Sequence, residues 1–176
     1  MSQPEEVHLN RGVIYSDCLR QDAAAERELN AALALNPAYL PALLNLANLK
    51  EDLGKRDAAL AIYENIIALE PRYYEALARY ASLKTVRDAD DPLIDRLRQA
   101  IADAGTTSVD RASLGFALGK VLDACGAYNQ AFDAYIVANR HSRESASQSS
   151  GLRPALYDRR QDRKSTRLNS SHPYRS

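Results

Sequence analysis

The sequence predicts an all-α protein, a right-handed superhelical solenoid of about four helical hairpins. The first observation is an internal repeat, because Asn36-Pro37 and Glu70-Pro71 lie one 34-residue period apart and close similar apolar segments. The second is that apolar residues between these prolines recur at the spacing of a helix. The third is that Gly54 and Gly126 stand where a helix end requires a left-handed residue. Since one hairpin cannot bury its apolar face alone, neighbouring hairpins are expected to stack, with one concave and one convex side.

The composition is that of one globular domain. The chain has 176 residues, of which 45% are hydrophobic and 26% charged. Its formal net charge is zero, which argues against a broad basic surface for nucleic acid or for an anionic membrane. The N-terminus is polar and acidic, and no apolar run is long enough to span a bilayer, so we expect a cytoplasmic protein. Cys18 and Cys125 are far apart and have no Cys/His cluster beside them, so we expect free thiols, no metal and no cofactor.

The first hairpin is expected within residues 5–38. Gly12 and Tyr15 take the small and the aromatic positions of its first helix. Ala25 and Leu29 fit its second helix only if one extra residue is inserted in the turn around residues 19–21.

The second hairpin, residues 39–72, has the most regular pattern. Its apolar and small positions, with the turn glycine between them, are Leu43, Leu46, Ala47, Gly54, Ala59, Tyr63 and Ile66. Tyr63 falls at the position where successive hairpins pack together, so we expect it to be buried.

The third hairpin, residues 73–107, departs from the pattern in its turn, which becomes Arg87–Pro92. Asp91 is expected to cap the following helix, with Pro92 at the first helical position. About four extra residues, within 105–109, then delay the last hairpin.

The fourth hairpin, residues 108–140, repeats the second, and its positions are Leu118, Gly119, Leu122, Gly126, Ala131, Tyr135 and Ala138. The spacing of small and aromatic residues in these two hairpins resembles the tetratricopeptide repeat over about residues 5–140. The resemblance implies a protein that binds other proteins or peptides along its concave groove.

The residues after 140 form a different segment. The apolar period stops at His141, so residues 141–161 are expected to be a polar linker containing the start of a further helix. Residues 162–176 resemble a translated sequencing adapter, and we expect an artefactual, disordered tail there.

No arrangement of residues predicts a catalytic centre. The sequence contains no HExxH motif, no Ser/His/Asp order and no glycine-rich phosphate loop. We therefore expect this chain not to be an enzyme, and to have a protein or peptide partner but no nucleic-acid or membrane partner.

The candidate peptide groove follows the first helix of each hairpin and comprises Leu9, Val13, Leu44, Asn45, Asn48, Asp52 and Arg79. Tetratricopeptide co-chaperones bind a peptide's terminal carboxylate with lysines, an arginine and asparagines at such positions. Asn45 and Arg79 match that set, whereas Leu9, Val13 and Glu75 replace its other members. A groove that is apolar and acidic is instead expected to select an extended segment with apolar anchors and a basic residue.

A narrower resemblance involves residues 90–97, 112–139 and 157–161. These segments resemble the repeat region that precedes the catalytic domain of bacterial tetratricopeptide-repeat sulfotransferases, enzymes that use a 3′-phosphoadenylyl-sulfate donor. The resemblance implies that the chain is a fragment of such a protein and lacks its catalytic domain. The alternative is a stand-alone adaptor that binds an extended peptide in its concave groove.

Overall fold

A computed structural model describes residues 3–150, with side chains through residue 147. Within this range the protein has no β-strand and consists of eight α-helices with one π-helical turn, η1. Their bounds are α1 Pro4–Val13, η1 Ile14–Cys18, α2 Asp22–Leu35, α3 Leu40–Asp52, α4 Arg56–Leu69, α5 Tyr74–Leu83, α6 Pro92–Ala102, α7 Ser108–Ala124 and α8 Tyr128–Ser150. The predicted fold class, an all-α solenoid of helical hairpins, is confirmed. The expected tail at 162–176 and residues 151–161 of the expected linker lie outside the described residues.

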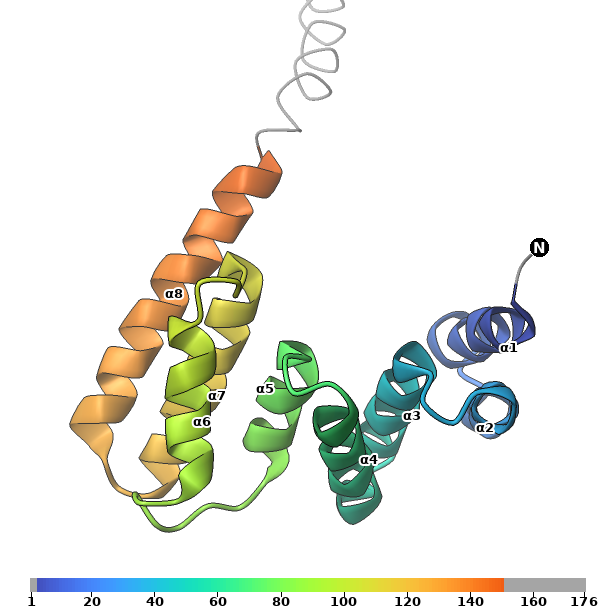
Figure 1. Ribbon diagram of the computed structural model, residues 1–176, viewed down its shortest axis with the longest axis horizontal. Coiled ribbons are helices and arrows are strands. Elements are labelled where there is room, and N and C mark those ends of the chain that lie inside the picture. The colour runs from blue at the N-terminus through green and yellow to red at the C-terminus, as the bar shows by residue number, and fades with distance from the viewer. Residues whose placement is uncertain (1–2, 151–176) are drawn as a thin grey trace, which may run out of the picture.

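The helices are arranged in a row, with α1 and α2 at one end and α8 at the other (Figure 1). Within the row α1 packs on α2, α3 on α4 and α7 on α8. A small apolar cluster joins the first hairpin to α3, and a larger one extends from α3 to α8. Leu33 and Ile62 pack against both clusters, so the apolar packing is continuous from the first hairpin to the last.

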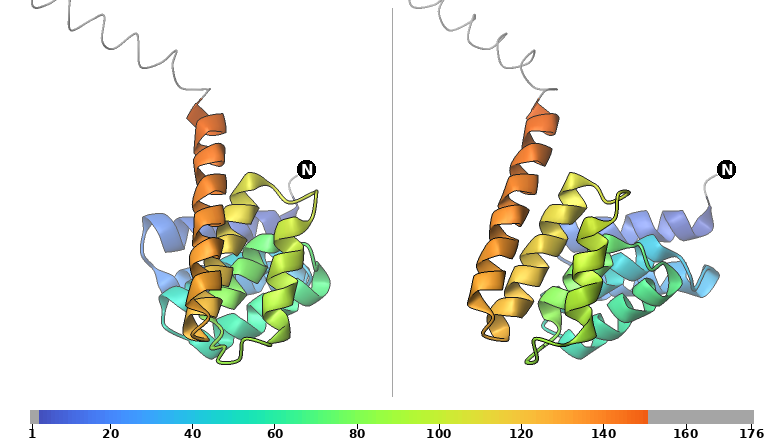
Figure 2. Two further views of the ribbon diagram at one scale, coloured as in Figure 1. Left: turned by 90° about the vertical axis from the view of Figure 1, so that its left-hand side faces the viewer. Right: turned by 60° about the vertical axis from the view of Figure 1, so that its left-hand side comes forward.

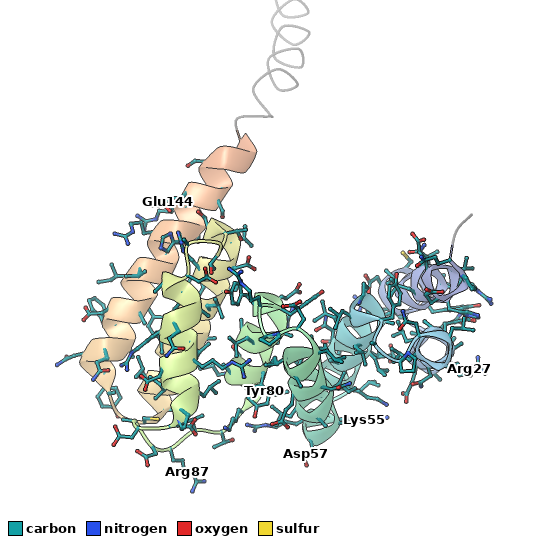
Figure 3. The ribbon with its side chains drawn as sticks, viewed as in Figure 1. Arg27, Lys55, Asp57, Tyr80, Arg87 and Glu144 are labelled. Atoms are coloured by element: carbon teal, nitrogen blue, oxygen red, sulfur yellow. The ribbon has the colours of Figure 1, made fainter. Side chains whose placement is uncertain are left out.

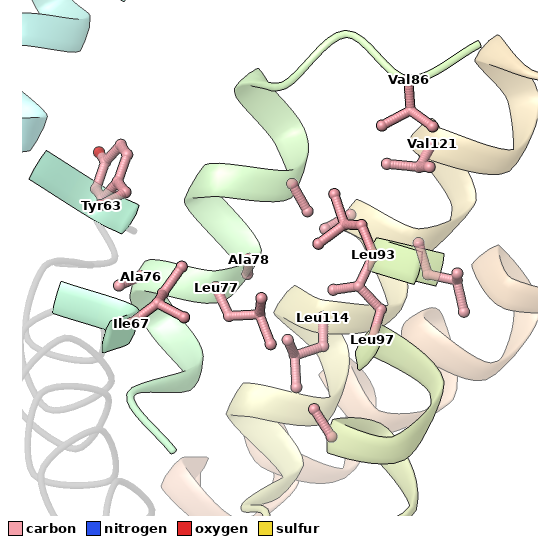
Figure 4. Close-up of a cluster of buried hydrophobic side chains, with 14 of the residues drawn as sticks. Tyr63, Ile67, Ala76, Leu77, Ala78, Val86, Leu93, Leu97, Leu114 and Val121 are labelled. Atoms are coloured by element: carbon pink, nitrogen blue, oxygen red, sulfur yellow. The ribbon is translucent and has the colours of Figure 1, made fainter. Parts of the chain in front are cut away.

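The third pair of helices differs from the regular hairpin that the repeat predicted. Few contacts join α5 to α6, and both helices pack mainly on α7. Leu77 of α5, Leu93 of α6 and Leu114 of α7 point toward one another in the core (Figure 4). The intervening connection, residues 84–91, is fixed because Val86 is buried next to Val121. The long turn therefore lets α6 leave α5 and cover α7 instead. At its end the predicted cap is present, since Asp91 Oδ1 accepts a hydrogen bond from Leu93 N at 2.9 Å and Pro92 is the first residue of α6.

The first hairpin accommodates its extra residue in η1. In this turn Leu19 N donates to Ile14 O at 3.1 Å, five residues back, which is how a π-helical turn absorbs one added residue. The chain then reverses at Arg20, whose φ of 53° lies in the left-handed region. Gly54 and Gly126 make the corresponding reversals at φ of 70° and 77°. The first hairpin thus uses an arginine where the second and fourth use glycine.

We expect Arg20→Gly to raise the free energy of unfolding by about 0.5–1 kcal/mol. A side chain in the left-handed region costs about 1–2 kcal/mol, and the entropy that glycine adds to the unfolded chain offsets part of this gain. Urea unfolding measures the change, and Arg27→Gly, inside α2, should instead destabilise by about 1 kcal/mol. A loss of stability for Arg20→Gly would show that the arginine side chain stabilises the turn.

Helix α8 is longer than the sequence predicted. It continues through Ser150, so the expectation of a linker beginning at residue 141 is wrong as far as residue 150. No glycine or proline occurs between Gly126 and Gly151, so nothing in residues 141–150 breaks the helix. His141 Nδ1 also lies 2.8 Å from Glu144 Oε2, at a spacing of three residues that supports a helix. The loss of the apolar period marks the point where α8 passes beyond α7, as Figure 2 shows, and not the end of the helix.

The loop between α6 and α7 is tied to the start of α5 by Asp103. Its Oδ2 accepts hydrogen bonds from the Tyr74 hydroxyl at 2.5 Å and from Arg72 Nη2 at 2.6 Å, and its Oδ1 accepts from Gly105 N at 3.0 Å. The Tyr74 hydrogen bond, followed by those from Gly105 and Arg72, lowers the pKa of Asp103 to about 2 from its ordinary value of 3.8.

This shift predicts a pH-dependent contribution to stability. Because the pKa of Asp103 is lower in the folded than in the unfolded chain, the contribution is complete above the ordinary pKa and is lost as pH falls toward 2. We therefore expect Asp103→Asn to be less stable than the parent at pH 7, and the difference to shrink between about pH 4 and pH 2. Denaturant unfolding at a series of pH values measures it, with the exposed Asp95→Asn as control. A difference that does not change with pH would contradict the role assigned to this carboxylate.

Candidate binding groove

A groove crosses α3, α5 and α7, the first helices of the last three pairs. It encloses about 510 Å³ and is lined by Glu51, Glu75, Ala78, Arg79, Ser82, Val109, Asp110 and Ser113. Three carboxylates and one guanidinium thus surround a surface that also includes Ala78 and an exposed Val109. The charged residues come from all three helices, so the groove exists only because the hairpins stack.

Of the predicted groove residues, Arg79 lines this groove. Glu75, predicted on the same helical stripe, lies there too and has no hydrogen bond or ion pair among the described residues. Arg79 Nη1 is 3.8 Å from Glu51 Oε1, a long contact between two partly exposed groups. Such a pair contributes little to stability, so both charges can interact with a bound segment.

The prediction that Leu44 lines the groove is wrong. Leu44 is 9% exposed and belongs to the core cluster that extends from α3 to α8. The helical stripe that faces the groove on α3 therefore begins farther along, at Glu51, because Leu44 packs in the core instead.

The two predicted asparagines have partners inside the protein. Asn45 Nδ2 donates to Pro41 O at 2.8 Å, one turn back in α3. Asn48 Oδ1 lies 2.7 Å from the hydroxyl of Tyr63, on α4. Both amides therefore satisfy polar groups of the repeat itself. Neither they nor Leu9, Val13 and Asp52 are among the residues that line the groove, and Leu9 and Val13 lie on α1 at the far end of the row.

Tyr63 connects the core to the groove. Its ring is fully buried, as predicted, and its hydroxyl lies 2.7 Å from Asn48 Oδ1 and 2.8 Å from Glu51 Oε2. Burial, followed by the hydrogen bond to Glu51, raises the pKa of the Tyr63 hydroxyl, so the phenol stays protonated and can donate. The carboxylate of Glu51 is thereby held at the groove by a residue of the core. The sequence does not predict this hydrogen bond, because Glu51 is there only an acidic residue near the end of a helix.

A second hollow, of about 280 Å³, lies at the C-terminal end of α5 and includes the cations Arg56, Lys84 and Lys120. Lys120 Nζ donates to Ser82 O at 2.7 Å, and Arg56 donates to Leu83 O. These carbonyls have no partner within their own helix, so the two cations complete the end of α5. The cations of this second hollow therefore have a structural role, because they satisfy the last carbonyls of α5.

The described part of the chain offers no metal site of three or more His, Cys, Asp or Glu residues. No helix within residues 3–150 combines the length and the apolar character needed to cross a membrane. The charges and hollow of the groove are suited to binding a chain segment.

Comparisons with known proteins agree with the fold. No family model matches the chain. An uncharacterized protein of Aquifex aeolicus (strain VF5) is 30% identical over 135 residues, which are 77% of this chain and 16% of that protein. The chain thus spans about a sixth of the length of this relative.

Solved structures of MamA, a tetratricopeptide-like helical-repeat protein, are similar in fold. One MamA crystal structure superposes with a TM-score of 0.64 at 17% identity, covering 81% of each chain. A second has a TM-score of 0.65 at 20% identity over 100% of both chains, and the MamA RS-1 ArsTM double mutant has 0.62 at 18% identity over 82% and 78%. At these identities the similarity establishes the fold, a tetratricopeptide-like stack of helical hairpins.

Proposed function

We propose that this chain is a scaffold for protein–protein interaction, which binds an extended segment of a partner in the groove across α3, α5 and α7. The observation that supports this most is the groove itself, of about 510 Å³, in which Glu75 has no hydrogen-bond or ion-pair partner in residues 3–147 and Tyr63 holds Glu51 in place. The similarity of fold to MamA, a tetratricopeptide-like protein, is consistent with a binding role.

The charges of the groove favour one class of segment. Glu51, Glu75 and Asp110 outnumber Arg79, so a segment with a lysine or arginine gains electrostatic attraction there. Val109, which is exposed, offers apolar contact to a neighbouring side chain of the same segment. We therefore expect the partner to present a basic residue next to an apolar one, in an extended conformation.

A random-peptide display library, selected on the full chain, tests this proposal. We expect the selected peptides to be enriched in a basic residue beside an apolar one, and their affinity to fall about tenfold in Glu75→Lys, equivalent to about 1.4 kcal/mol. Fluorescence anisotropy with one selected peptide measures the loss.

The matched control is Glu64→Lys, which makes the same charge change on an exposed position of α4, outside the groove. Asn48→Ala is unsuitable as a probe because it also removes the partner of Tyr63. If Glu64→Lys weakens the peptide as much as Glu75→Lys does, the effect is one of net charge and the groove is not the binding site.

The finer proposal is that these hairpins are the repeat region of a longer polypeptide, a bacterial sulfotransferase. It is supported by the resemblance of residues 90–97 and 112–139, and by a relative of which this chain matches 16%. The genomic sequence downstream of codon 161 tests it. An open reading frame encoding a strand, a phosphate-binding loop and a helix is the expected result, and a stop codon there would favour the stand-alone adaptor.

A further inference from the structure

The last helix has an unpartnered apolar stripe. Tyr128, Phe132 and Ile136 follow one another at intervals of four residues and therefore share one face of α8. They are 68%, 65% and 53% exposed. Helix α8 forms the end of the row, and Figure 3 shows its side chains projecting from the molecule with no described element opposite them. Two large aromatic side chains and an isoleucine in register are unusual on an exposed helix face.

The repeat architecture does not require this stripe. Gly54, Ala59 and Tyr63 of the second hairpin correspond to Gly126, Ala131 and Tyr135 of the fourth, and the same register relates α4 to α2. The positions that correspond to the stripe are Arg56, Leu60 and Glu64 in α4, and Asp22, Glu26 and Asn30 in α2. Five of these six residues are polar. Where a hairpin follows, Glu26 pairs with Lys50 of α3, and Arg56 donates to Leu83 O and to Thr85 at the end of α5. Asp22, Asn30 and Glu64 remain exposed, so the stacking of a further hairpin does not account for an apolar stripe on this face.

The same helix also contains a surface that is complementary to the stripe. Directly beyond Phe132, a shallow hollow of about 540 Å³ is lined by Ile136, Asn139, Arg140, Arg143, Glu144 and Ser147. The side chains of Arg140 and Arg143 have no hydrogen bond or ion pair among the described residues. The N-terminal half of this face is thus aromatic, and its C-terminal half is concave and cationic.

We propose that α8 is a self-association surface, on which two copies of this chain pair antiparallel about a two-fold axis near Ile136. Antiparallel pairing places the aromatic half of each helix against the cationic half of the other, as an isologous interface requires. Phe132 of one copy then enters the hollow of the second copy beside its Arg140, where a guanidinium over an aromatic face adds a cation–π attraction. Asp133, which is exposed and has no ion pair with another described residue, lies on the flank of the same helix within reach of Arg140 of the second copy.

The surface involves one helix from each copy, so the interface is at the small end for specific association. We expect a monomer–dimer equilibrium with a dissociation constant in the range of tens of micromolar. Sedimentation velocity of the full chain, from a few micromolar to several hundred micromolar, measures it.

Phe132→Ser should raise the dissociation constant at least tenfold, and Arg140→Glu should weaken the dimer as well. Leu35→Ser, which removes a similarly exposed leucine at the end of α2, should leave the dissociation constant unchanged. Circular dichroism checks that each variant keeps its helix content. A parent chain that stays monomeric throughout, or equal effects of Phe132→Ser and Leu35→Ser, would overturn the proposal.

The orientation has its own test, in a chain with Cys18→Ser and Cys125→Ala. In an antiparallel pair centred on Ile136, two copies of Ile136→Cys meet at the axis and form a disulfide on mild oxidation. The two copies of Tyr128→Cys lie about 24 Å apart along the helix and do not. Cross-linking at residue 128 as efficient as at 136 would show a different pairing and would exclude the antiparallel interface.

Discussion

Tyr63→Ala is expected to lower the free energy of unfolding by about 3–5 kcal/mol. Tyr63 is fully buried and lies in the cluster that joins α3, α4 and α5. Replacing it with alanine removes the largest fully buried side chain of the described residues and leaves a cavity at the contact between two hairpins. Because each hairpin is stable only through its neighbours, damage at this contact should lower the stability of the whole stack. Urea unfolding followed by circular dichroism gives the value.

Tyr63→Phe separates the packing of the ring from the hydrogen bonds of the hydroxyl. The ring remains, and the variant loses only the contacts with Asn48 and Glu51. Both partners are partly exposed and can bind water instead, so we expect a cost of about 1 kcal/mol. If Tyr63→Ala were no more destabilising than Tyr63→Phe, the ring would not be the element that joins the hairpins.

Tyr63→Phe should also loosen the hold on the Glu51 carboxylate in the groove. Without the hydroxyl, Glu51 loses its connection to the core and keeps only the 3.8 Å contact with Arg79. The proposed binding site therefore depends on a core residue that does not line it.

The sequence was sufficient for those parts of the fold that local chemistry dictates. The turn glycines, the cap Asp91 with Pro92, and Gly119 against the ring of Tyr135 are all set by backbone geometry or by close contact. At each of these positions few other residue types would fit. The extra residue of the first hairpin was also visible in the sequence, but its accommodation by a π-helical turn was not, because η1 has no distinguishing composition.

The remaining features depend on contacts between distant residues. Leu44 and Glu51 lie on the same helix, and the packing between hairpins decides that the first is buried in the core while the second lines the groove. The packing of α6 on α7, not on α5, likewise follows from the length of the 84–91 connection and the burial of Val86. The end of α8 could not be predicted from the apolar period, because a helix that passes beyond its neighbour does not need one. Arg79, a candidate groove residue, and Glu75 both lie on the part of α5 that lines the groove.

Gly115→Val is expected to lower the free energy of unfolding by about 3 kcal/mol or more, because it forces α7 and α8 apart. A Cβ atom at residue 115 would lie 2.9 Å from the Cβ of Ala138 and 3.3 Å from its Cα. Ala138 is fully buried, and its Cα can move only if the backbone of α8 moves. Overpacking in a core costs about 1–3 kcal/mol even where side chains can adjust, and here the obstacle is the main chain. The gain in helix propensity over glycine, a few tenths of a kcal/mol, is too small to offset this.

Two variants separate this steric effect from other consequences of the substitution. Ser113→Val introduces valine at an exposed position of α7 and should change the free energy of unfolding by less than about 0.5 kcal/mol. Gly126→Ala adds a Cβ where nothing lies within 4 Å, so its expected cost of about 1 kcal/mol is due to the positive φ alone. Guanidinium unfolding should therefore give Gly115→Val a much lower free energy of unfolding than Gly126→Ala. The free energy of unfolding of Ser113→Val should be close to that of the parent. If Gly115→Val unfolded at the same denaturant concentration as Ser113→Val, α7 and α8 could not be in contact at residues 115 and 138. The placement of the α8 surface relative to the rest of the stack would then have to be revised, because that contact fixes the helix against α7.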